Sequence, residues 1–155
     1  NKKYNIVTNS LNFRLSDINC ALVYSQLKKI KKFVKKRNSI ATFYNDKTKH
    51  MQQYFTPLVK NNFSYNSWHL YQIILDKKFK DHRDKLMKFF LKKKIITQIH
   101  YLPIYKHSIF KNLKSKNLRN SELFYQRVIS LPIFYQLNRK KQERIVTILI
   151  DFFRK

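Results

Sequence analysis

Apolar side chains recur at spacings of three and four residues over the first third of the chain. The recurring positions are Ile30, Phe33, Val34, Ala41 and Tyr44. This spacing lines one face of an α-helix, and most of the neighbouring lysines fall beside that face. Ser16 can cap the first turn, and Asp17 places a favourable negative charge in it. The pattern predicts a long amphipathic helix from Asp17 to about Lys49, after an irregular lead-in over residues 1–15.

Apolar and aromatic residues dominate two later runs, at residues 68–75 and 95–101. Each run predicts a β-strand, and Pro103 ends the second one. The turn-rich segment 56–66 has room for one further short strand. Between the two runs, helical spacing returns over residues 83–94. The apolar inner face of that helix consists of Leu86, Phe89 and Phe90.

Two more helices are predicted in the last third of the chain. A short one covers residues 121–129, after a loop at 106–120 that is rich in Lys, Asn and Ser. Asn138 can cap the last helix. The apolar stripe of the last helix consists of Ile145, Ile148, Leu149 and Phe152. The order of elements predicts a single α+β domain over residues 1–155, with helices packed against a small sheet.

Charge is the unusual feature of the composition. The 155 residues include 34 Lys and Arg against 8 Asp and Glu, a net charge of +26, and 43% are hydrophobic. That much apolar material suits a folded domain. Gly is absent while Lys, Asn, Ile, Tyr and Phe are abundant, which indicates an AT-rich genome, and the lysines are dispersed over the chain. Codon bias therefore accounts for much of the charge, while a basic nucleic-acid-binding domain stays open as an alternative function.

The sequence also excludes several kinds of site. Without glycine there is no P-loop, dinucleotide fingerprint or nucleophile elbow. Cys20 stands alone, so no internal disulfide can form, and the five histidines lack the spacing of a metal motif. No apolar run approaches the roughly 18 residues of a membrane span. We expect no metal, no membrane association and a cytoplasmic location. The start at Asn1, without an initiator Met, indicates a piece of a longer protein.

Four segments, taken in order, resemble a known family. Residues 12–18 read N-F-R-L-S-D-I and lead into A-L-V-Y-S-Q-L at 21–27. Residues 67–71 read S-W-H-L-Y, and residues 97–105 read T-Q-I-H-Y-L-P-I-Y. A weaker match is S-L-P at 130–132. In this order and spacing, the sequence resembles the DegT/DnrJ/EryC1/StrS family of sugar aminotransferases.

The resemblance implies the C-terminal small domain of a fold type I enzyme that depends on pyridoxal phosphate. In the family, an N-terminal large domain carries the lysine that forms the Schiff base, so this chain alone is expected to hold no catalytic residue and to be inactive. The intact protein would be a homodimer that moves an amino group, commonly from glutamate, to a UDP- or dTDP-linked keto-sugar for a surface glycan. The tyrosine at position 105, after the H-Y-L-P turn, resembles the residue found there in transaminases of the pseudaminic acid route. A non-catalytic sugar-binding relative stays open as an alternative.

The resemblance also implies roles for four residues. Asn12 would donate from its side-chain amide to the cofactor phosphate of the neighbouring subunit. Arg14 has a planar guanidinium suited to phosphate and would lie near the cofactor or the nucleotide-sugar. His100 and Tyr101 end a predicted strand just before a proline, a common position for binding groups, and would face the nucleotide-sugar.

Other residues of the motifs are expected to be structural. Trp68, His69 and Tyr71 are predicted to build the core. The sequence departs from the family before the Q-I-H-Y segment, where relatives commonly have glycine and this chain has Lys94 and Ile95. This difference puts the geometry of the loop in question more than the fold.

Overall fold

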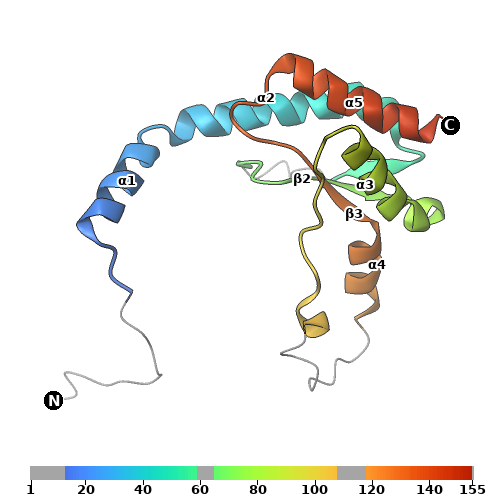
Figure 1. The fold of residues 1–155 in the computed structure, drawn as a ribbon, viewed down its shortest axis with the longest axis horizontal. Helices are drawn as coiled ribbons and strands as arrows, with labels where there is room; N and C mark the ends of the chain where they lie inside the picture. Colours follow the sequence, from blue (N-terminus) through green and yellow to red (C-terminus); the bar gives the residue numbers. More distant parts are fainter. Residues whose placement is uncertain (1–12, 59–64, 108–117, 155) are drawn as a thin grey trace. The chain divides into compact units, whose positions relative to one another are not determined.

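The computed structural model describes residues 13–58, 65–107 and 118–154. The chain divides into two compact units, residues 1–32 and 33–155. Figure 1 shows the elements along the chain. The helices are α1 (Asp17–Leu27), α2 (Ile30–Thr48), α3 (Arg83–Lys92), α4 (Arg119–Arg127) and α5 (Arg139–Phe153). The 3-10 helices are η1 (Lys49–Met51), η2 (Lys77–His82) and η3 (Ile104–Lys106), and the strands are β1 (Phe55–Pro57), β2 (Tyr71–Leu75) and β3 (Val128–Leu131).

In the first unit, α1 is a capped helix with no buried side chain. The Oγ of Ser16 accepts a hydrogen bond of 3.4 Å from the amide of Asn19, which confirms the predicted N-cap. Asp17 lies in the first turn, where its charge complements the helix dipole.

The single long helix predicted over residues 17–49 is wrong in one respect, because a turn at Lys28 and Lys29 separates α1 from α2. The amide of Lys29 bonds at 2.9 Å to the carbonyl of Gln26, three residues back instead of four. A tighter turn of this kind is common where one helix ends. The apolar residues of α1 bury nothing that would hold the two helices in one continuous register.

In the second unit, α2 buries its last three turns. The buried residues are Ile40, Ala41, Phe43, Tyr44 and Thr48. Ala41 and Tyr44 belong to the predicted stripe, and Phe33 and Val34 are half-buried, so the predicted face is confirmed there. Ile30 is half exposed.

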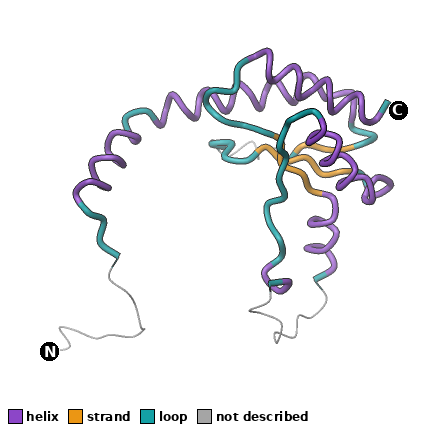
Figure 2. Tube along the Cα trace, viewed as in Figure 1, coloured by secondary structure: helices purple, strands orange, loops and turns teal. Residues whose placement is uncertain are grey.

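The three strands form one antiparallel sheet with the order β1-β2-β3. Phe55 pairs with Leu75 on one side of β2, and Tyr71 pairs with Leu131 on the other. Figure 2 shows the strands side by side in orange. Every second residue of β2 is buried, as a strand with one face on the core requires.

The predicted strands are only partly right. β2 begins at Tyr71, because Trp68 has a positive φ of 49° and bends the chain before the strand. Residues 95–101 do not form a strand, since only Gln98 makes a bridge, with Ser130, and Ile96 is 72% exposed. β2 is the central strand, and β3 (Val128–Leu131) pairs along its other edge instead. The first residues of β3, Val128 and Ile129, fall within the helix predicted at residues 121–129, because so short an apolar run fits either element.

α3 packs on α5 and on β3, and α4 packs on η2 and β2. The Oδ1 of Asn138 accepts from the amide of Lys141 at 3.0 Å, so the predicted cap of α5 is confirmed. Leu86 and Phe90 of α3 are buried as predicted, and Phe89 is partly buried. From the predicted stripe of α5, Ile145, Ile148 and Leu149 are buried and Phe152 is partly buried.

Candidate functional site

The first candidate segment is the lead-in to α1. Asn12 lies outside the described residues. Arg14 is exposed, in extended chain two residues before the N-cap Ser16. Within the described part of the chain, the Arg14 guanidinium has no hydrogen-bond or ion-pair partner. A free guanidinium of this kind can bind an anion such as a phosphate without first breaking an internal ion pair.

The second candidate segment crosses the end of the sheet at His100. The amide of Gln98 donates to the carbonyl of Ser130 at 3.3 Å, and the amide of Ser130 donates to the carbonyl of Gln98 at 2.8 Å. The side chain of Gln72, on β2, donates from Nε2 to the carbonyl of His100 at 3.1 Å. The Nδ1 of His100 lies 2.7 Å from the Oγ of Ser130. The position and ring of His100 are therefore fixed by β2 and β3 together.

Tyr101 directly follows His100 across a cis peptide bond. Its side chain is 69% exposed, and its ring meets the imidazole edge-on, with centroids 4.7 Å apart. The structure therefore brings His100 and Tyr101 together, one anchored to the sheet and the other open to solvent. An exposed aromatic ring beside a polar donor is typical of a site for a ring-shaped ligand.

Tyr101 also lines a hollow of about 520 Å³ between the chain around η3 and the helix α4. The hollow is lined by Tyr101, Pro103, Ile104, Tyr105, Leu118, Asn120, Ser121, Phe124 and Tyr125. Most of these side chains are apolar or aromatic, and only a few can form hydrogen bonds. This composition matches that of small-molecule sites.

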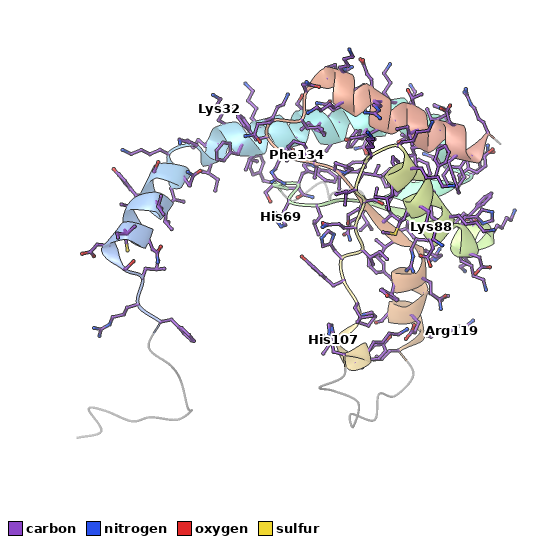
Figure 3. The ribbon with its side chains drawn as sticks, viewed as in Figure 1. Lys32, His69, Lys88, His107, Arg119 and Phe134 are labelled. Carbon is purple, nitrogen blue, oxygen red and sulfur yellow. The ribbon has the colours of Figure 1, made fainter. Side chains whose placement is uncertain are left out.

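A polar cluster fastens η3 to α4 beside this hollow. The hydroxyl of Tyr105 donates to Glu122 Oε1 at 2.7 Å, and Lys106 Nζ lies 2.7 Å from Glu122 Oε2. The bonds from Lys106 and then Tyr105 lower the pKa of Glu122 below its ordinary value. Desolvation by neighbouring atoms, followed by the bond to Glu122, raises the pKa of Tyr105 to about 12. His107 follows directly after η3 (Figure 3).

Two cations flank the ring of Tyr125 at this cluster. Lys106 Nζ lies 5.2 Å from the ring centroid and Arg83 Cζ lies 5.1 Å from it. Arg83 also donates to the backbone carbonyl of Tyr125 and forms an ion pair with Asp84 at 2.8 Å. These contacts hold one wall of the hollow by cation–π attraction as well as by hydrogen bonds.

The S-W-H-L-Y segment is held from α2. Arg37 Nη1 donates to the carbonyls of Trp68 and His69 at 3.0 and 2.9 Å. Trp68 and Tyr71 are buried, as predicted. The prediction that His69 builds the core is wrong, because the bend at Trp68 leaves the His69 side chain exposed (Figure 3).

Sequence reasoning missed four residues at the site. Ser130 stood in the S-L-P match without a role, and nothing in its neighbourhood indicated a bond to His100. Gln72, Lys106 and Glu122 carried no signal, since each bonds to a residue distant in the sequence or in another element. Only the pairing of β2 with β3 brings Gln72 and Ser130 to His100.

The described residues contain no group of three or more His, Cys, Asp or Glu side chains that could hold a metal ion. In the same part of the chain, no helix has both the length and the hydrophobicity needed to cross a membrane.

The fold is shared with solved structures of longer proteins. Helicobacter pylori PseC, an aminotransferase involved in the biosynthesis of pseudoaminic acid, superposes with a TM-score of 0.86 at 33% identity, over 97% of this chain and 40% of that one. DesV of S. venezuelae, in complex with a ketimine intermediate, gives a TM-score of 0.84 at 21% identity, over 99% of this chain and 41% of that one. The second likeness shows the fold alone. The architecture is that of a pyridoxal-phosphate-dependent aminotransferase, in its mixed helix and small-sheet part.

Residues 1–150 match the DegT/DnrJ/EryC1/StrS aminotransferase family, and the chain belongs to that family. A UDP-4-amino-4,6-dideoxy-N-acetyl-beta-L-altrosamine transaminase of Campylobacter jejuni subsp. jejuni serotype O:2 is 34% identical over 145 residues, which are 93% of this chain and 38% of the relative. The Helicobacter pylori transaminase of the same name is 35% identical, over 92% of this chain and 38% of the relative. The chain thus spans little more than a third of the length of these relatives.

Proposed function

We propose that this chain is the C-terminal small domain of a nucleotide-sugar aminotransferase that depends on pyridoxal phosphate. The observation that carries the proposal is the family match over residues 1–150, which covers nearly the whole chain. The chain spans 38% of the relatives' length, which is the share expected of a small domain with its connecting helix. The large domain, with the lysine that forms the Schiff base, would belong to the remaining part of the intact protein.

The acceptor proposed for the intact protein is a UDP-linked 4-keto hexose, and the amino donor is glutamate. Two relatives above 30% identity are named as transaminases of a UDP-linked amino sugar, which supports the nucleotide and the sugar class. PseC, at 33% identity, is named as an aminotransferase involved in the biosynthesis of pseudoaminic acid. The product would enter surface glycan synthesis in the cytoplasm.

The residues of this chain fit one part of the cofactor. Arg14 presents a guanidinium that is free within the described residues, which suits a phosphate group. Asn12, two residues earlier, would add a side-chain amide donor. No lysine of the chain stands in the family's Schiff-base motif, so we assign none to the reaction. When bound, pyridoxal phosphate supplies an electron sink for amino transfer.

His100 and Tyr101 are proposed to contact the nucleotide-sugar. The imidazole offers a hydrogen-bonding nitrogen from a position fixed by Gln72 and Ser130, and the exposed ring of Tyr101 offers an apolar face. Arg14 is proposed to act across a homodimer, in the site of the neighbouring subunit.

The test compares the intact protein with the 155-residue chain. The intact protein, given pyridoxal phosphate and glutamate, is expected to aminate a UDP-linked 4-keto hexose, with the product detected by mass spectrometry. The chain alone is expected to be inactive, and borohydride reduction with the cofactor should label only scattered surface lysines. One specific stoichiometric adduct with turnover in the chain alone would contradict the small-domain assignment.

Two results with the intact protein would replace the proposal by an alternative. Sugar binding without turnover would indicate a non-catalytic sugar-binding relative. Binding of DNA or RNA that weakens steeply with salt would indicate phosphate contacts and a nucleic-acid function.

A further inference from the structure

The bond between His100 and Ser130 constrains which nitrogen of the imidazole carries the proton. The two atoms, Nδ1 of His100 and Oγ of Ser130, are 2.7 Å apart. Ser130 lies in the middle of β3 and is only 5% exposed, so its hydroxyl has little access to water. Within the described residues, Nδ1 of His100 is the sole partner of this hydroxyl.

A serine hydroxyl can donate one hydrogen bond and can also accept. If Nδ1 carried the proton, it would donate to Ser130 Oγ, and the buried hydroxyl hydrogen would have no acceptor among the described residues. If Nδ1 is unprotonated, the hydroxyl donates to it and every buried polar hydrogen of the pair is satisfied. Buried donors without acceptors are unfavourable. The second arrangement is therefore preferred, and in the neutral ring the proton then lies on Nε2.

The remaining nitrogen is open to a ligand. Within the described residues, Nε2 of His100 has no hydrogen-bond partner. Nε2 is also not buried, because the buried side-chain atoms without a partner do not include it. The backbone of His100 is fixed independently, since Gln72 binds its carbonyl and Gln98 bridges to the backbone of Ser130. The ring consequently offers a donor at a defined place next to the exposed ring of Tyr101.

We propose that Ser130 is a positioning residue, which holds the neutral imidazole of His100 in the tautomer that carries its proton on Nε2. In that tautomer, His100 donates a hydrogen bond from Nε2 to an acceptor oxygen of the nucleotide-sugar. The part played by the ligand rests on the proposed function, whereas the tautomer does not. Ser130 itself does not touch the ligand. It determines whether Nε2 of His100 acts as a hydrogen-bond donor or as an acceptor.

The tautomer is tested directly by long-range proton–nitrogen NMR of the 155-residue chain labelled with nitrogen-15 in histidine. Spectra are recorded at a pH high enough for neutral imidazoles to predominate, and the His100 signals are assigned by their loss in His100→Gln. The wild-type chain is expected to show His100 protonated on Nε2, with the Nδ1 resonance shifted as for a bonded acceptor. A wild-type ring protonated on Nδ1 would overturn the proposal without any further variant.

The variants then test the cause. Ser130→Ala should move the Nδ1 resonance towards that of a free acceptor and raise the share of the Nδ1-protonated form several-fold, while Ser130→Thr, which keeps a hydroxyl, should restore the wild-type spectrum. The exposed His69 is the internal control, and its resonances should not change. Unchanged His100 resonances in a folded Ser130→Ala chain would overturn the proposal.

The ligand part is tested with the intact protein. Ser130→Ala is expected to raise the KM for the nucleotide-sugar about three- to tenfold, as loss of one well-placed hydrogen bond does, with kcat and the KM for glutamate nearly unchanged. Ser130→Thr should recover the wild-type KM. An equal fall in kcat/KM for the nucleotide-sugar and for glutamate would indicate a structural role and contradict the proposal. An intact protein without aminotransferase activity would refute the proposed function and leave the NMR result to decide the positioning by Ser130.

Discussion

The hydroxyl of Tyr44 donates a hydrogen bond of 2.9 Å to the backbone carbonyl of Pro132, 88 residues further along the chain. Tyr44 is fully buried on α2, and Pro132 follows directly after β3. The Tyr44 ring also meets the ring of Tyr71 on β2, with centroids 4.9 Å apart. Burial raises the pKa of Tyr44 far above its ordinary value, so the hydroxyl stays a donor throughout the neutral range. One side chain thus joins α2 to the central strand β2 and to the residue that follows β3.

Tyr44→Phe is expected to lower the free energy of unfolding by about 1 kcal/mol, the usual contribution of one neutral hydrogen bond. Because phenylalanine retains the ring packing, the loss of stability comes from the missing hydrogen bond to the Pro132 carbonyl. Urea unfolding followed by circular dichroism measures it. Tyr65→Phe is the matched control, because Tyr65 is 81% exposed, and it should change the free energy by less than about 0.5 kcal/mol. Equal effects of the two substitutions would contradict the assigned role of Tyr44.

Lys94, in the region where the family resemblance implies a glycine, has a backbone conformation that glycine adopts most readily. Its φ is 58°, in the left-handed region, just after the end of α3. The amide of Lys94 bonds to the Leu91 carbonyl at 2.8 Å, and the amide of Ile95 bonds to the Phe90 carbonyl at 3.0 Å. This is the Schellman ending of a helix, in which glycine is preferred because it has no Cβ. The chain makes this helix ending without a glycine, at the expense of backbone strain at Lys94.

Lys94→Gly should raise the free energy of unfolding by about 0.5–1 kcal/mol. The left-handed conformation costs a non-glycine residue about 1–2 kcal/mol, and the greater freedom of glycine in the unfolded chain offsets part of the gain. Lys88→Gly, at an exposed position within α3 (Figure 3), is the control and should destabilise by about 1 kcal/mol. Urea unfolding of both variants gives the comparison. A destabilised Lys94→Gly chain would show that Lys94 contributes contacts that outweigh its backbone strain.

The stability of the fold is expected to depend on pH through the cluster of Tyr105, Lys106 and Glu122. Because the folded-state pKa of Glu122 is lowered, its stabilising contribution is present above its ordinary value of 4.5 and is lost as the pH falls through the lowered value. Carbon-13 NMR of the Glu122 carboxyl should give a midpoint below 4.5. Lys106→Met should shift that midpoint upward, since Lys106 is the larger cause. Arg139→Met, which removes the partner of Glu143 instead, should leave the Glu122 midpoint where it is.

The surface of α1 predicts self-association of the chain. The exposed large apolar side chains in and next to α1 are Phe13, Leu15, Ile18, Leu22, Val23, Tyr24, Leu27 and Ile30. So many exposed large apolar side chains in and next to one helix are unusual for a surface that stays in water. Sedimentation velocity is expected to show association, and Leu22→Gln with Val23→Gln should reduce it. Leu91→Gln, at a similarly exposed leucine of α3, should have little effect. A monodisperse wild-type monomer that unfolds cooperatively would contradict this prediction.

Helices with a stripe and a cap could be predicted from the sequence, and the strands could be predicted less well. The caps at Ser16 and Asn138 are local signals, because the donor lies three residues away. β3 is four residues long and wholly buried, so it shows neither alternation nor a helical period. Residues 95–101 have the composition of a strand, but the neighbouring place beside β3 accommodates only the bridge at Gln98. Pairing with strands distant in the sequence decides whether β3 and residues 95–101 form strands. The local sequence pattern contains no information about that pairing.

In the candidate site, too, residues in a local motif could be predicted and residues brought in by strand pairing could not. His100 and Tyr101 could be named from the motif, and in the structure their rings meet with centroids 4.7 Å apart. Their contact with a nucleotide-sugar stays a prediction. Ser130 and Gln72 could not be named, because their partner is 28 to 30 residues away in the chain and the bond depends on strand register. Register is a property of two strands and their turn, and single-residue preferences do not contain it.

Arg14 provides the last prediction, which concerns the intact protein. Its guanidinium is free within the described residues and belongs to no apolar stripe, so Arg14→Ala should leave the free energy of unfolding unchanged. If Arg14 binds a phosphate, Arg14→Ala should weaken cofactor or nucleotide-sugar binding about ten- to hundredfold, because charge-assisted hydrogen bonds are lost. Arg14→Lys should recover only part of the affinity, since an ammonium cannot reproduce the planar pair of donors.

Mixing two full-length variants, assayed at ligand concentrations at which each alone has little activity, decides whether Arg14 serves its own subunit or the neighbouring one. One variant lacks the Schiff-base lysine and the other carries Arg14→Ala. If each site takes its lysine from one subunit and Arg14 from the other, a mixed dimer contains one site with both groups intact and one site with neither. Activity should then return to about half of the wild-type value per mixed dimer, by the closed symmetry of a two-fold dimer. Subunit exchange is confirmed separately by native mass spectrometry. Exchange without recovery of activity would show that Arg14 acts within its own subunit or has no part in the reaction.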